Sequence, residues 1–401
     1  MGSTALTPRR VAVVHDYLNQ YGGAERVVEA MHRAFPAAPI HTTIYDRARM
    51  PESFRAMDVR ASFLQRAPGI FDHFRRYLPL YPAAIRSLQI EPCDVVVSSS
   101  SAFAMGARIP AGARHLSYCY NPMRFAWDTE RYLERETMGP LARAALSPFL
   151  AYLRRWDLAN AKRVDRFLTS CRNVAERIRR TYGREAEIVY PPVDVSRWKS
   201  LAAAPESGAA LDAAIGGGGF TTRGFFLVVS RLRAYKRVDL AVDACAAAGL
   251  PLLVIGDGEE RASLQSRAGR TVRFLGRQSD AVVAAAYARC AGLVFPGEED
   301  FGLTPVEAMA CGAPVVAFAA GGALETLTGP VVSPDGSATP LPRGARPTGL
   351  FFSSQTVASL GAALHAMRKT RFRPADGIQS ALRFDEPVFV QKLSIEAATL
   401  R

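Results

Sequence analysis

The stretch EEDFGLTPVEAMACG, from Glu298 to Gly312, decides the fold together with the apolar run GLVFPG that precedes it. The run is short and apolar, as in a strand buried on both faces, and the residues after the Phe-Gly pair favour a short helix. Two glutamates, Glu299 and Glu307, stand eight positions apart across this turn. The stretch therefore predicts a strand, a loop and a helix in succession, the repeating unit of an α/β domain.

The same pattern recurs along the rest of the chain. In the second half, apolar runs separated by helical stretches lie at 225–230, 252–258, 272–276, 292–297 and 313–318. In the first half, such runs lie at 11–15, 94–101, 115–122 and 165–171. Strands that alternate with helices indicate parallel sheets covered on both faces. The expected fold class is α/β, with two doubly wound parallel-sheet domains.

The chain length of 401 residues suits two domains of roughly 150 to 200 residues each. We expect a first domain over 1–198, a second over 199–385, and a final helix over about 386–401 that packs back on the first domain. Residues 201–219, with small residues, proline and four consecutive glycines, predict a linker or a mobile excursion. The Pro- and Gly-rich residues 331–349 predict a surface insertion.

The composition favours a globular protein inside the cell. Apolar residues make up 49% of the chain, but no apolar run is long enough to span a bilayer, and the first residues lack the apolar core of a signal peptide. The six cysteines are scattered without the spacing of a zinc site, so we expect buried thiols and no metal. The expected location is the cytoplasm.

The net charge of +13 is uneven, because residues 1–198 account for +10 of it. This excess predicts that the first domain meets something acidic. The sequence contains no nucleic-acid-binding motif and no compact basic run with interleaved aromatic residues, so we expect no nucleic-acid partner. A spread of arginines better suits an anionic membrane surface, or a lipid or sugar that carries phosphate.

Ligands of open parallel sheets bind at the carboxyl ends of the strands, so the loops after the strands of the second half hold the candidate site. Arg231 and Lys236 could hold a diphosphate and stabilise the charge that grows on it as it leaves; the alternative is a solvated basic turn. Gly256 and Gly258 favour tight packing over nucleotide binding. Arg277 could contact a base or a phosphate, although a plain surface turn is the more frequent meaning of such a segment.

The loop that contains the two glutamates has two interpretations. Thr304, Pro305 and Glu307 match a capping box with proline in the first turn, which would make Glu307 a helix cap. The same helix start directs backbone N–H groups at the mouth of the sheet, where they can bind phosphate. Glu299 would overhang that place, so one glutamate could bind a ribose diol and the other a hexose diol. Glu325, after a further glycine turn, either lines the same cleft or is structural. The arrangement fits a nucleotide sugar.

These segments, taken in order, resemble a known family. The segments VSRLRAYKRVDLAVDA, VIGDGEER, VRFLGRQSD, EDFGLTPVEAMACGAPVVA and GGALET resemble the donor half of a retaining GT-B glycosyltransferase of family four. In the first half, HDYLNQYGGAERVVEAM, YCYNPMRFAWD and FLTSCRNVAERIRRTYGREAEIVYPPVD resemble bacterial polysaccharide and lipopolysaccharide mannosyltransferases. The resemblance implies two Rossmann-like domains that face each other across a cleft.

The resemblance also implies roles for single residues. Arg231 and Lys236 match the pair that holds the donor diphosphate, and Glu299 matches the glutamate on the donor sugar; these three are the expected catalytic residues. The expected donor-binding residues are Gly22 and Gly23 near the phosphates, Arg277 and Asp280 near the base, Phe301, Gly302 and Leu303 through backbone amides, and Glu307 on the ribose.

One position departs from the family. Many relatives have histidine where this chain has Tyr120, within YCYNPMR, and a phenol is no base near neutral pH. Either Tyr120 keeps a binding role or another group, such as His15 or Asp16, has taken it over. We therefore name His15, Asp16, Tyr120, Arg124 and Glu325 as further candidates for contact with the sugar or the acceptor.

The resemblance implies transfer with retention, in which the leaving phosphate accepts the proton of the acceptor hydroxyl. The chain has no D-x-D motif, so we expect metal-independent activity and no cofactor. The neighbourhood of YCYNPMRFAWD suggests GDP-mannose as donor. The expected acceptor is a glycan or lipid-linked intermediate at the inner membrane face, with residues 63–88 as a contact surface, although these could equally be ordinary core helices. The alternatives are a UDP-sugar-dependent transferase, a sugar-nucleotide epimerase and an inactive nucleotide-sugar-binding protein.

Overall fold

The computed structural model describes residues 10–128, 140–217 and 219–400. Contacts between residues divide the chain into two units. The first unit runs up to Pro192 and takes in the chain again from Pro387, and the second comprises Val193–Glu386. The sequence placed the boundaries a few residues away, at 198/199 and 385/386.

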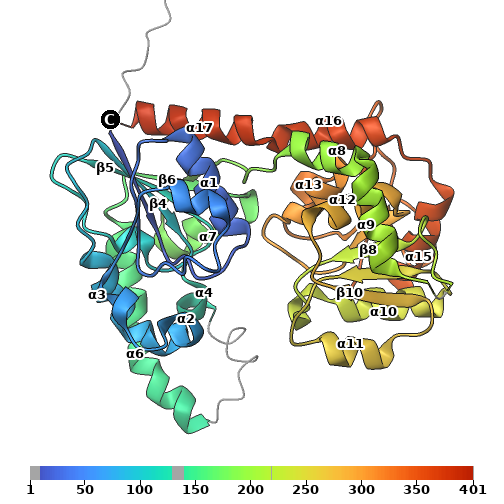
Figure 1. Ribbon diagram of the computed structural model, residues 1–401, viewed down its shortest axis with the longest axis horizontal. Coiled ribbons are helices and arrows are strands. Elements are labelled where there is room, and N and C mark those ends of the chain that lie inside the picture. The colour runs from blue at the N-terminus through green and yellow to red at the C-terminus, as the bar shows by residue number, and fades with distance from the viewer. Residues whose placement is uncertain (1–9, 129–139, 218, 401) are drawn as a thin grey trace, which may run out of the picture. The chain divides into compact units, whose positions relative to one another are not determined.

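Within the described residues, the first unit contains one seven-stranded sheet in the order β3-β2-β1-β4-β5-β6-β7, with every neighbouring pair parallel (Figure 1). The strands are β1 (Val11–His15), β2 (Ile40–Thr42), β3 (Val59–Ala61), β4 (Val95–Ser100), β5 (Arg114–Cys119), β6 (Arg166–Thr169) and β7 (Ala186–Ile188). The four strands that the sequence predicts are β1, β4, β5 and β6. The other three have three residues each, too short to show a pattern.

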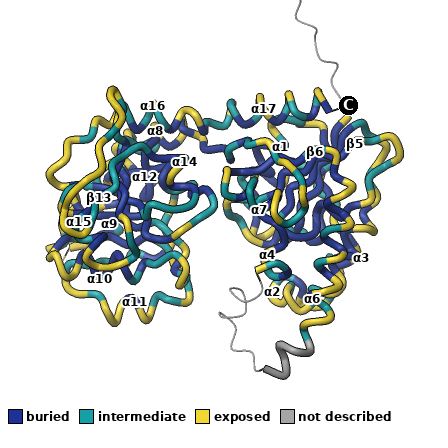
Figure 2. Tube along the Cα trace, turned by 180° about the vertical axis from the view of Figure 1, so that it is seen from behind, coloured by how far each residue is buried: buried dark blue, intermediate teal, exposed yellow. Residues whose placement is uncertain are grey.

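Helices pack on both faces of this sheet, and the alternation of side chains along the strands explains how. Val13 of β1 belongs to one buried apolar cluster and Val14 to another, because successive side chains of a strand point to opposite faces. Figure 2 shows the strands as the buried interior of the unit. The helices are α1 (Gly23–Ala34), α2 (Ile70–His73), α3 (Tyr81–Arg86), α4 (Arg124–Trp127), α6 (Pro140–Ala161) and α7 (Arg172–Tyr182), with 3-10 helices η1 (Glu52–Ala56), η2 (Phe63–Arg66), η3 (Phe74–Leu80) and η4 (Ala104–Gly106).

The last helix, α17 (Glu386–Thr399), packs on the first unit. Its residues Phe389, Leu393 and Ala397 are buried in the cluster that also contains the first-unit strands. The Phe389 ring lies 5.7 Å from the ring of Tyr118, edge to face. Glu396 forms an ion pair of 2.6 Å with Arg166 at the start of β6. The C-terminal helix therefore belongs to the hydrophobic core of the first unit.

The second unit contains a second parallel sheet, with seven strands among the described residues in the order β10-β9-β8-β11-β12-β14-β13. The strands are β8 (Phe226–Val229), β9 (Leu252–Ile255), β10 (Val272–Gly276), β11 (Gly292–Phe295), β12 (Val315–Phe318), β13 (Val331–Val332) and β14 (Gly349–Phe352). The sequence predicts the first five. It assigns Val331–Val332 and Gly349 to an insertion, which is wrong at both ends, because these residues pair in the sheet; residues 334–340 between them are exposed.

The helices of the second unit follow the doubly wound pattern. They are α8 (Val195–Ala203), α9 (Pro205–Ile215), α10 (Val238–Ala247), α11 (Arg261–Arg267), α12 (Asp280–Arg289), α13 (Leu303–Ala310), α14 (Ala323–Thr326), α15 (Val357–Lys369) and α16 (Pro374–Ala381), with 3-10 helices η5 (Ala234–Lys236) and η6 (Leu382–Phe384). None of the described helices in either unit combines the length and the apolar character that crossing a bilayer requires.

The prediction of a linker over 201–219 is wrong, because most of this segment is helical. Helix α9 begins with Pro205 in its first turn and packs against α12. Its two large apolar residues, Leu211 and Ile215, stand one turn apart and are buried. Arg289 of α12 forms an ion pair of 2.6 Å with Asp212 of α9. The other apolar residues of the helix are mostly alanines, so its apolar face is too narrow to appear as a pattern in the sequence.

Candidate active site

The centre of the candidate site is an ion pair between Lys236 and Glu299, two of the three predicted catalytic residues. Lys236 ends η5 after β8, and Glu299 lies in the loop after β11, the neighbour of β8 in the sheet. The side chains are 15% and 20% exposed, so both groups are partly shielded and still reachable from solvent. The carboxyl ends of adjacent parallel strands thus bring a cation and an anion together, as the strand order requires.

Strained backbone holds Lys236 in place. The next residue, Arg237, has φ +52°, and it is the only non-glycine with positive φ among the described residues. Its guanidinium contacts Asp239 at 3.2 Å and donates to the side-chain oxygen of Gln355 at 3.3 Å. Gln355 in turn donates to the carbonyl of Pro296 at 2.8 Å, in the loop that leads to Glu299. These contacts tie the two loops of the ion pair to each other.

Two consecutive glycines, Gly321 and Gly322, pack against the backbone of Glu299. The amide of Gly322 donates to the Glu299 carbonyl at 2.8 Å. Gly321 has φ +59°, and a Cβ atom there would lie 2.3 Å from the same carbonyl oxygen. A Cβ atom at Gly322 would lie 2.3 Å from the Cα of Phe301. Only glycine allows these two backbone segments to approach so closely.

Arg231 lies exposed after β8, and within the described residues no hydrogen bond or ion pair joins it to Lys236 or Glu299. The Gly256-Asp257-Gly258 turn packs against its loop. A Cβ atom at Gly256 would lie 1.8 Å from the Ser230 carbonyl oxygen, and one at Gly258 would lie 2.3 Å from that of Leu232. The expected packing role of these glycines is therefore confirmed. The diphosphate contact of Arg231 stays a prediction.

The predicted capping box at Thr304 is wrong. Helix α13 begins at Leu303 with Gly302 as its N-cap, and no side chain caps it. Gly302 has φ +81°, and a Cβ atom there would lie 2.7 Å from the Phe295 ring, so the turn demands glycine and starts the helix earlier than the box implies. Phe301 before it is buried, with its ring 5.4 Å from that of Phe384.

Glu307 lies in the middle of α13 and is only 4% exposed. The hydroxyl of Tyr287 in α12 donates to its carboxylate at 3.4 Å. It is therefore no helix cap, and its assignment to the ribose stays a prediction.

Three further candidates of the second unit, Arg277 and Asp280 for the donor and Glu325 for the sugar or the acceptor, lie on separate elements. Arg277 is exposed after β10. Asp280 begins α12 and forms an ion pair of 2.8 Å with Arg197 of α8. Glu325 lies in α14, and its carbonyl accepts a hydrogen bond of 3.1 Å from Arg383. The structure thus brings Lys236 and Glu299 into contact and leaves the roles of these three residues as predictions.

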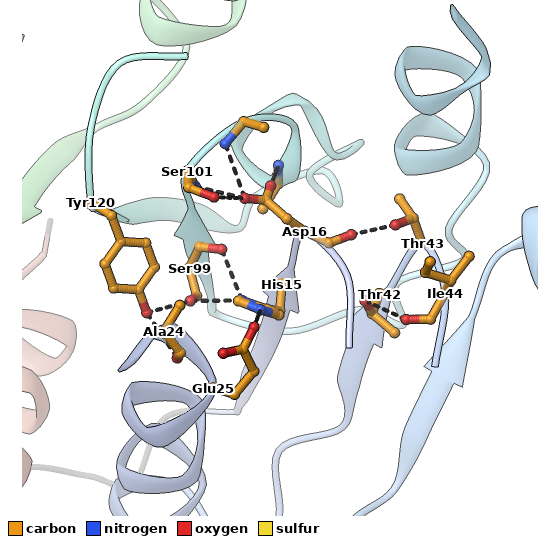
Figure 3. Close-up of polar contacts among 12 residues, drawn as sticks. His15, Asp16, Ala24, Glu25, Thr42, Thr43, Ile44, Ser99, Ser101 and Tyr120 are labelled. Carbon is orange, nitrogen blue, oxygen red and sulfur yellow. Dashed lines mark hydrogen bonds and ion pairs between the residues drawn. The ribbon is translucent and has the colours of Figure 1, made fainter. Parts of the chain in front are cut away.

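In the first unit, Asp16 follows β1 and holds the turn after β4 (Figure 3). Its two carboxylate oxygens accept hydrogen bonds of 2.6–3.0 Å from the amides of residues 101–104 and from the Ser101 hydroxyl. Five donors fill the lone-pair positions of the two carboxylate oxygens, so few positions remain to accept a hydrogen bond from a sugar hydroxyl. The described contacts of Asp16 are those of a structural residue.

His15 and Tyr120 lie together beside the first turn of α1 (Figure 3). Both contact the hydroxyl of Ser99, His15 through Nδ1 and Tyr120 through its phenol, each at 2.9 Å. Gly22 is the N-cap of α1 and Gly23 is its first residue. Arg124 is exposed at the start of α4.

Sequence reasoning missed Ser99 and Glu25, which complete this cluster. Glu25 is buried and has an oxygen 3.8 Å from His15 Nε2. The signal for Ser99 was present in the run of four serines at the end of a predicted strand, where side chains reach the site edge of the sheet. Glu25 gave no signal of its own, because a charged residue in the first turn of a helix is ordinary.

A buried carboxyl group, Asp157 of α6, also escaped the sequence analysis. Trp127 and Tyr182 each donate a hydrogen bond of 2.7 Å to one of its oxygens. Burial raises the pKa of Asp157 to about 6, although these two donors lower it. Within the described residues, no group of three or more His, Cys, Asp or Glu side chains is placed to hold a metal ion.

A pocket of about 620 Å³ lies at the β2 and β3 edge of the first unit. It is lined by His41, Arg60, Phe63, Leu88 and Glu91, among others. The guanidinium of Arg60 is paired there with Asp58 at 2.8 Å and with Glu91 at 2.7 Å. The positive charge of Arg60 in this mixed polar and apolar pocket is therefore balanced by carboxylates.

The two parallel seven-stranded sheets of the described residues, each with packed helices, define the class of the protein as a GT-B fold of two Rossmann-like domains. Residues 21–197 match the model of Glycosyltransferase Family 4, and residues 217–333 match that of Glycosyl transferases group 1. These matches support a glycosyltransferase of the family-four type.

Individual proteins agree with this class. The chain is 40% identical over 119 residues to a GDP-mannose-dependent alpha-mannosyltransferase of Mycolicibacterium smegmatis, across 28% of this chain and 32% of the relative. A protein of the same name from Mycobacterium tuberculosis is 40% identical over 101 residues, across 25% and 26%. The matches thus span about a third or less of these relatives. The Anabaena protein Alr3699/HepE, solved in complex with UDP, superimposes with a TM-score of 0.69 at 16% identity, covering 98% of this chain and 100% of that one.

Proposed function

We propose that this protein transfers a hexose from a nucleotide sugar to a glycan or lipid-linked acceptor, with retention and without a metal ion. The donor proposed is GDP-mannose. The local similarity to two GDP-mannose-dependent mannosyltransferases supports this sugar and nucleotide. The alternative is a UDP-sugar, since the Anabaena protein with the same fold was solved with UDP.

The observation that carries the proposal is the Lys236–Glu299 ion pair at the carboxyl end of the second sheet. A nucleotide sugar offers hydroxyls and a diphosphate next to each other, so it can satisfy both partners at once. Glu299 accepts hydrogen bonds from the sugar hydroxyls, and Lys236 turns to the diphosphate oxygens. The ion pair keeps both partly buried charges balanced until the donor arrives.

In this mechanism the cation acts on the leaving group. Negative charge grows on the diphosphate as the glycosidic bond breaks, and a fixed ammonium group stabilises it more in the transition state than in the ground state. Arg231 adds a second cation from the same loop. The departing phosphate oxygen takes the proton of the acceptor hydroxyl, so no protein base is required.

The acceptor is proposed to meet the first unit along residues 63–88. This segment has two exposed apolar side chains, Phe63 at 52% and Leu80 at 45%. It also has exposed arginines: Arg66, Arg75, Arg76 and Arg86. Exposed apolar and cationic groups in one segment suit the surface of a membrane with anionic lipids, and they support a location on the inner face of the plasma membrane.

Co-sedimentation with vesicles tests this placement. Vesicles of phosphatidylcholine with a third of phosphatidylglycerol should retain the protein, and added salt should release it because it screens the charges. Reversing two charges, with Arg75→Glu and Arg76→Glu, should weaken retention. Equal binding to pure phosphatidylcholine would contradict an electrostatic contact.

A thermal-shift screen tests the donor. GDP, UDP, ADP and their sugars are added in turn, because a ligand that binds only the folded protein raises Tm in proportion to the logarithm of its concentration over Kd. We expect selective stabilisation by GDP and GDP-mannose, unchanged by EDTA. A selective rise in Tm with UDP and UDP-sugars would identify a UDP-sugar as the donor in place of GDP-mannose. No shift with any nucleotide sugar would remove the proposal, and mass spectrometry of the products separates transfer from epimerisation.

A further inference from the structure

Three strand ends of the first unit are joined to the first turn of α1 by one chain of hydrogen bonds (Figure 3). The Tyr120 phenol, just after β5, donates to the carbonyl of Ala24 at 3.1 Å. It also contacts the hydroxyl of Ser99, in β4, at 2.9 Å. That hydroxyl lies 2.9 Å from Nδ1 of His15, the last residue of β1.

The groups at the two ends of this hydrogen-bond chain, the Ala24 carbonyl and the His15 ring, determine where its protons lie. Ala24 offers a carbonyl oxygen, which can only accept, so the single phenolic proton of Tyr120 points to it. The Ser99 hydroxyl must then donate to the Tyr120 oxygen and accept from His15. Nδ1 of His15 also lies 3.2 Å from the Ser99 carbonyl, another group that can only accept, so Nδ1 carries hydrogen. The donors therefore run in one direction, from His15 through Ser99 and Tyr120 to Ala24.

The other end of this hydrogen-bond chain, the His15 ring, also lies next to the first turn of α1. Nε2 of His15 is 3.8 Å from the carboxylate of Glu25, the residue after Ala24. Both side chains are about 95% or more buried, at 3% and 5% exposure. The first turn of α1, which follows Gly22 and Gly23, is thus hydrogen-bonded to Tyr120 and lies against His15.

We propose that Tyr120 is a positioning residue that fixes the Gly22–Gly23 segment and the first turn of α1, rather than a residue that contacts the sugar. Its hydroxyl already uses its one proton on Ala24 and accepts from Ser99. Burial raises the pKa of Tyr120 well above its usual value, so the phenol keeps the proton that it donates. The tyrosine that stands where many relatives have histidine thus acts on the protein backbone.

The expected effect on binding rests on the proposed function, in which Gly22 and Gly23 lie near the donor phosphates. The hydrogen-bond chain itself does not. Two measurements therefore separate the two ideas: backbone hydrogen exchange without ligand, and nucleotide affinity.

Amide hydrogen exchange of residues 20–28 is the first measurement. Tyr120→Phe removes one hydroxyl and keeps the ring, and Ser99→Ala breaks the same chain one step away. Each should speed exchange in this segment about three- to tenfold, and the double variant should add little, because both substitutions break one chain. Tyr152→Phe, at a half-exposed tyrosine of α6, is the matched control and should change nothing. Unchanged exchange in both Tyr120→Phe and Ser99→Ala would overturn the proposal.

Affinity for GDP and for GDP-mannose is the second measurement. A displaced glycine segment weakens contacts to phosphate, so Tyr120→Phe should weaken both ligands by the same factor, about three- to tenfold. If the hydroxyl bound the sugar, only GDP-mannose would lose affinity, and the positioning role would be refuted. If the wild-type protein binds neither ligand, the proposed donor fails, while the exchange measurement still decides the role of Tyr120.

Discussion

At the scale of single residues, the site depends on one partly buried contact between a positive and a negative side chain. Lys236 and Glu299 come from loops after neighbouring strands, and each was recognisable in the sequence by its place after an apolar run. Their contact with each other was not. It follows from the strained backbone of Arg237 and from the glycines that support the Glu299 loop, and both are tertiary features.

Replacing Lys236 with alanine tests the charge on the leaving group. The variant loses a preorganised cation and leaves Glu299 without its partner, so kcat should fall about 10²- to 10³-fold, with a smaller change in KM. Steady-state kinetics with GDP-mannose measures both constants. Arg233→Ala is the matched control, because Arg233 lies in the same loop and pairs with Glu259 at the surface; it should retain near-normal activity. A Lys236→Ala enzyme with almost unchanged kcat would refute the assignment.

At this scale one prediction is wrong and another stays untested, and the surroundings of each residue give the physical reason. Thr304 and Glu307 have the spacing of a capping box, but the turn at Gly302 starts α13 before Thr304 and leaves Glu307 buried inside the helix. Asp16 was named as a candidate for contact with the sugar or the acceptor, which stays a prediction; its carboxylate accepts five hydrogen bonds from the turn after β4. The spacing of residues in a sequence shows which polar groups could form a contact. It does not show which of those groups are buried or already hydrogen-bonded to other residues in the folded protein.

At the scale of elements, the loops after β11 and β12 are packed together, because their backbones are in contact. Gly322 approaches Phe301 so closely that a methyl group would collide with backbone atoms, which cannot move independently as a flexible side chain can. The Glu299 loop is thus positioned by the start of α14.

Replacing Gly322 with alanine tests this support. Its φ of −67° is ordinary, so the substitution changes only the space, and the added Cβ would lie 2.4 Å from the Asp300 carbonyl oxygen. A displacement of the Glu299 loop by about 1 Å should lower transfer about 10²-fold. Gly361→Ala in α15 is the control, since its Cβ would meet no atom within 4 Å. Full activity in Gly322→Ala would show that the loop position is not critical.

Helix α9 shows how a segment without an obvious pattern can still be part of the core. Replacing Leu211, which is fully buried against α12, with alanine should lower the free energy of unfolding by about 2–5 kcal/mol. Urea unfolding measures this value. Lys199→Ala, at an exposed position of α8, should change it by no more than about 0.5 kcal/mol. A negligible effect at Leu211 would support the linker that the sequence predicted.

At the scale of the whole molecule, stability should depend on pH through Asp157. Its folded-state pKa of about 6 lies above the ordinary value of 3.8, so the folded protein holds this proton more tightly than the unfolded chain does. The stability that the protonated group contributes is present below about pH 4 and is lost as pH rises to about 6. The loss is about 3 kcal/mol, from roughly two pKa units.

Asp157→Asn isolates this contribution, because an amide has no proton to lose in this range. The free energy of unfolding of the variant relative to wild type should be larger at pH 7.5 than at pH 4.5 by about 2 kcal/mol, because part of the loss in wild type already occurs below pH 4.5. Urea unfolding at the two pH values gives the comparison, and other titrating groups cancel in the difference. A difference that does not change with pH would mean that Asp157 titrates near its ordinary pKa.

The sequence by itself determined the two α/β domains, nine of the longer strands and the loops that carry Lys236 and Glu299, because periodic apolar runs and turn residues act over a few neighbouring positions. Only the tertiary structure decided that α9 is core and that His15, Ser99 and Tyr120 form one hydrogen-bonded chain to α1. These features depend on which distant segments the sheet order brings together. No local pattern records that information, since burial and hydrogen-bond partners are properties of the folded neighbourhood.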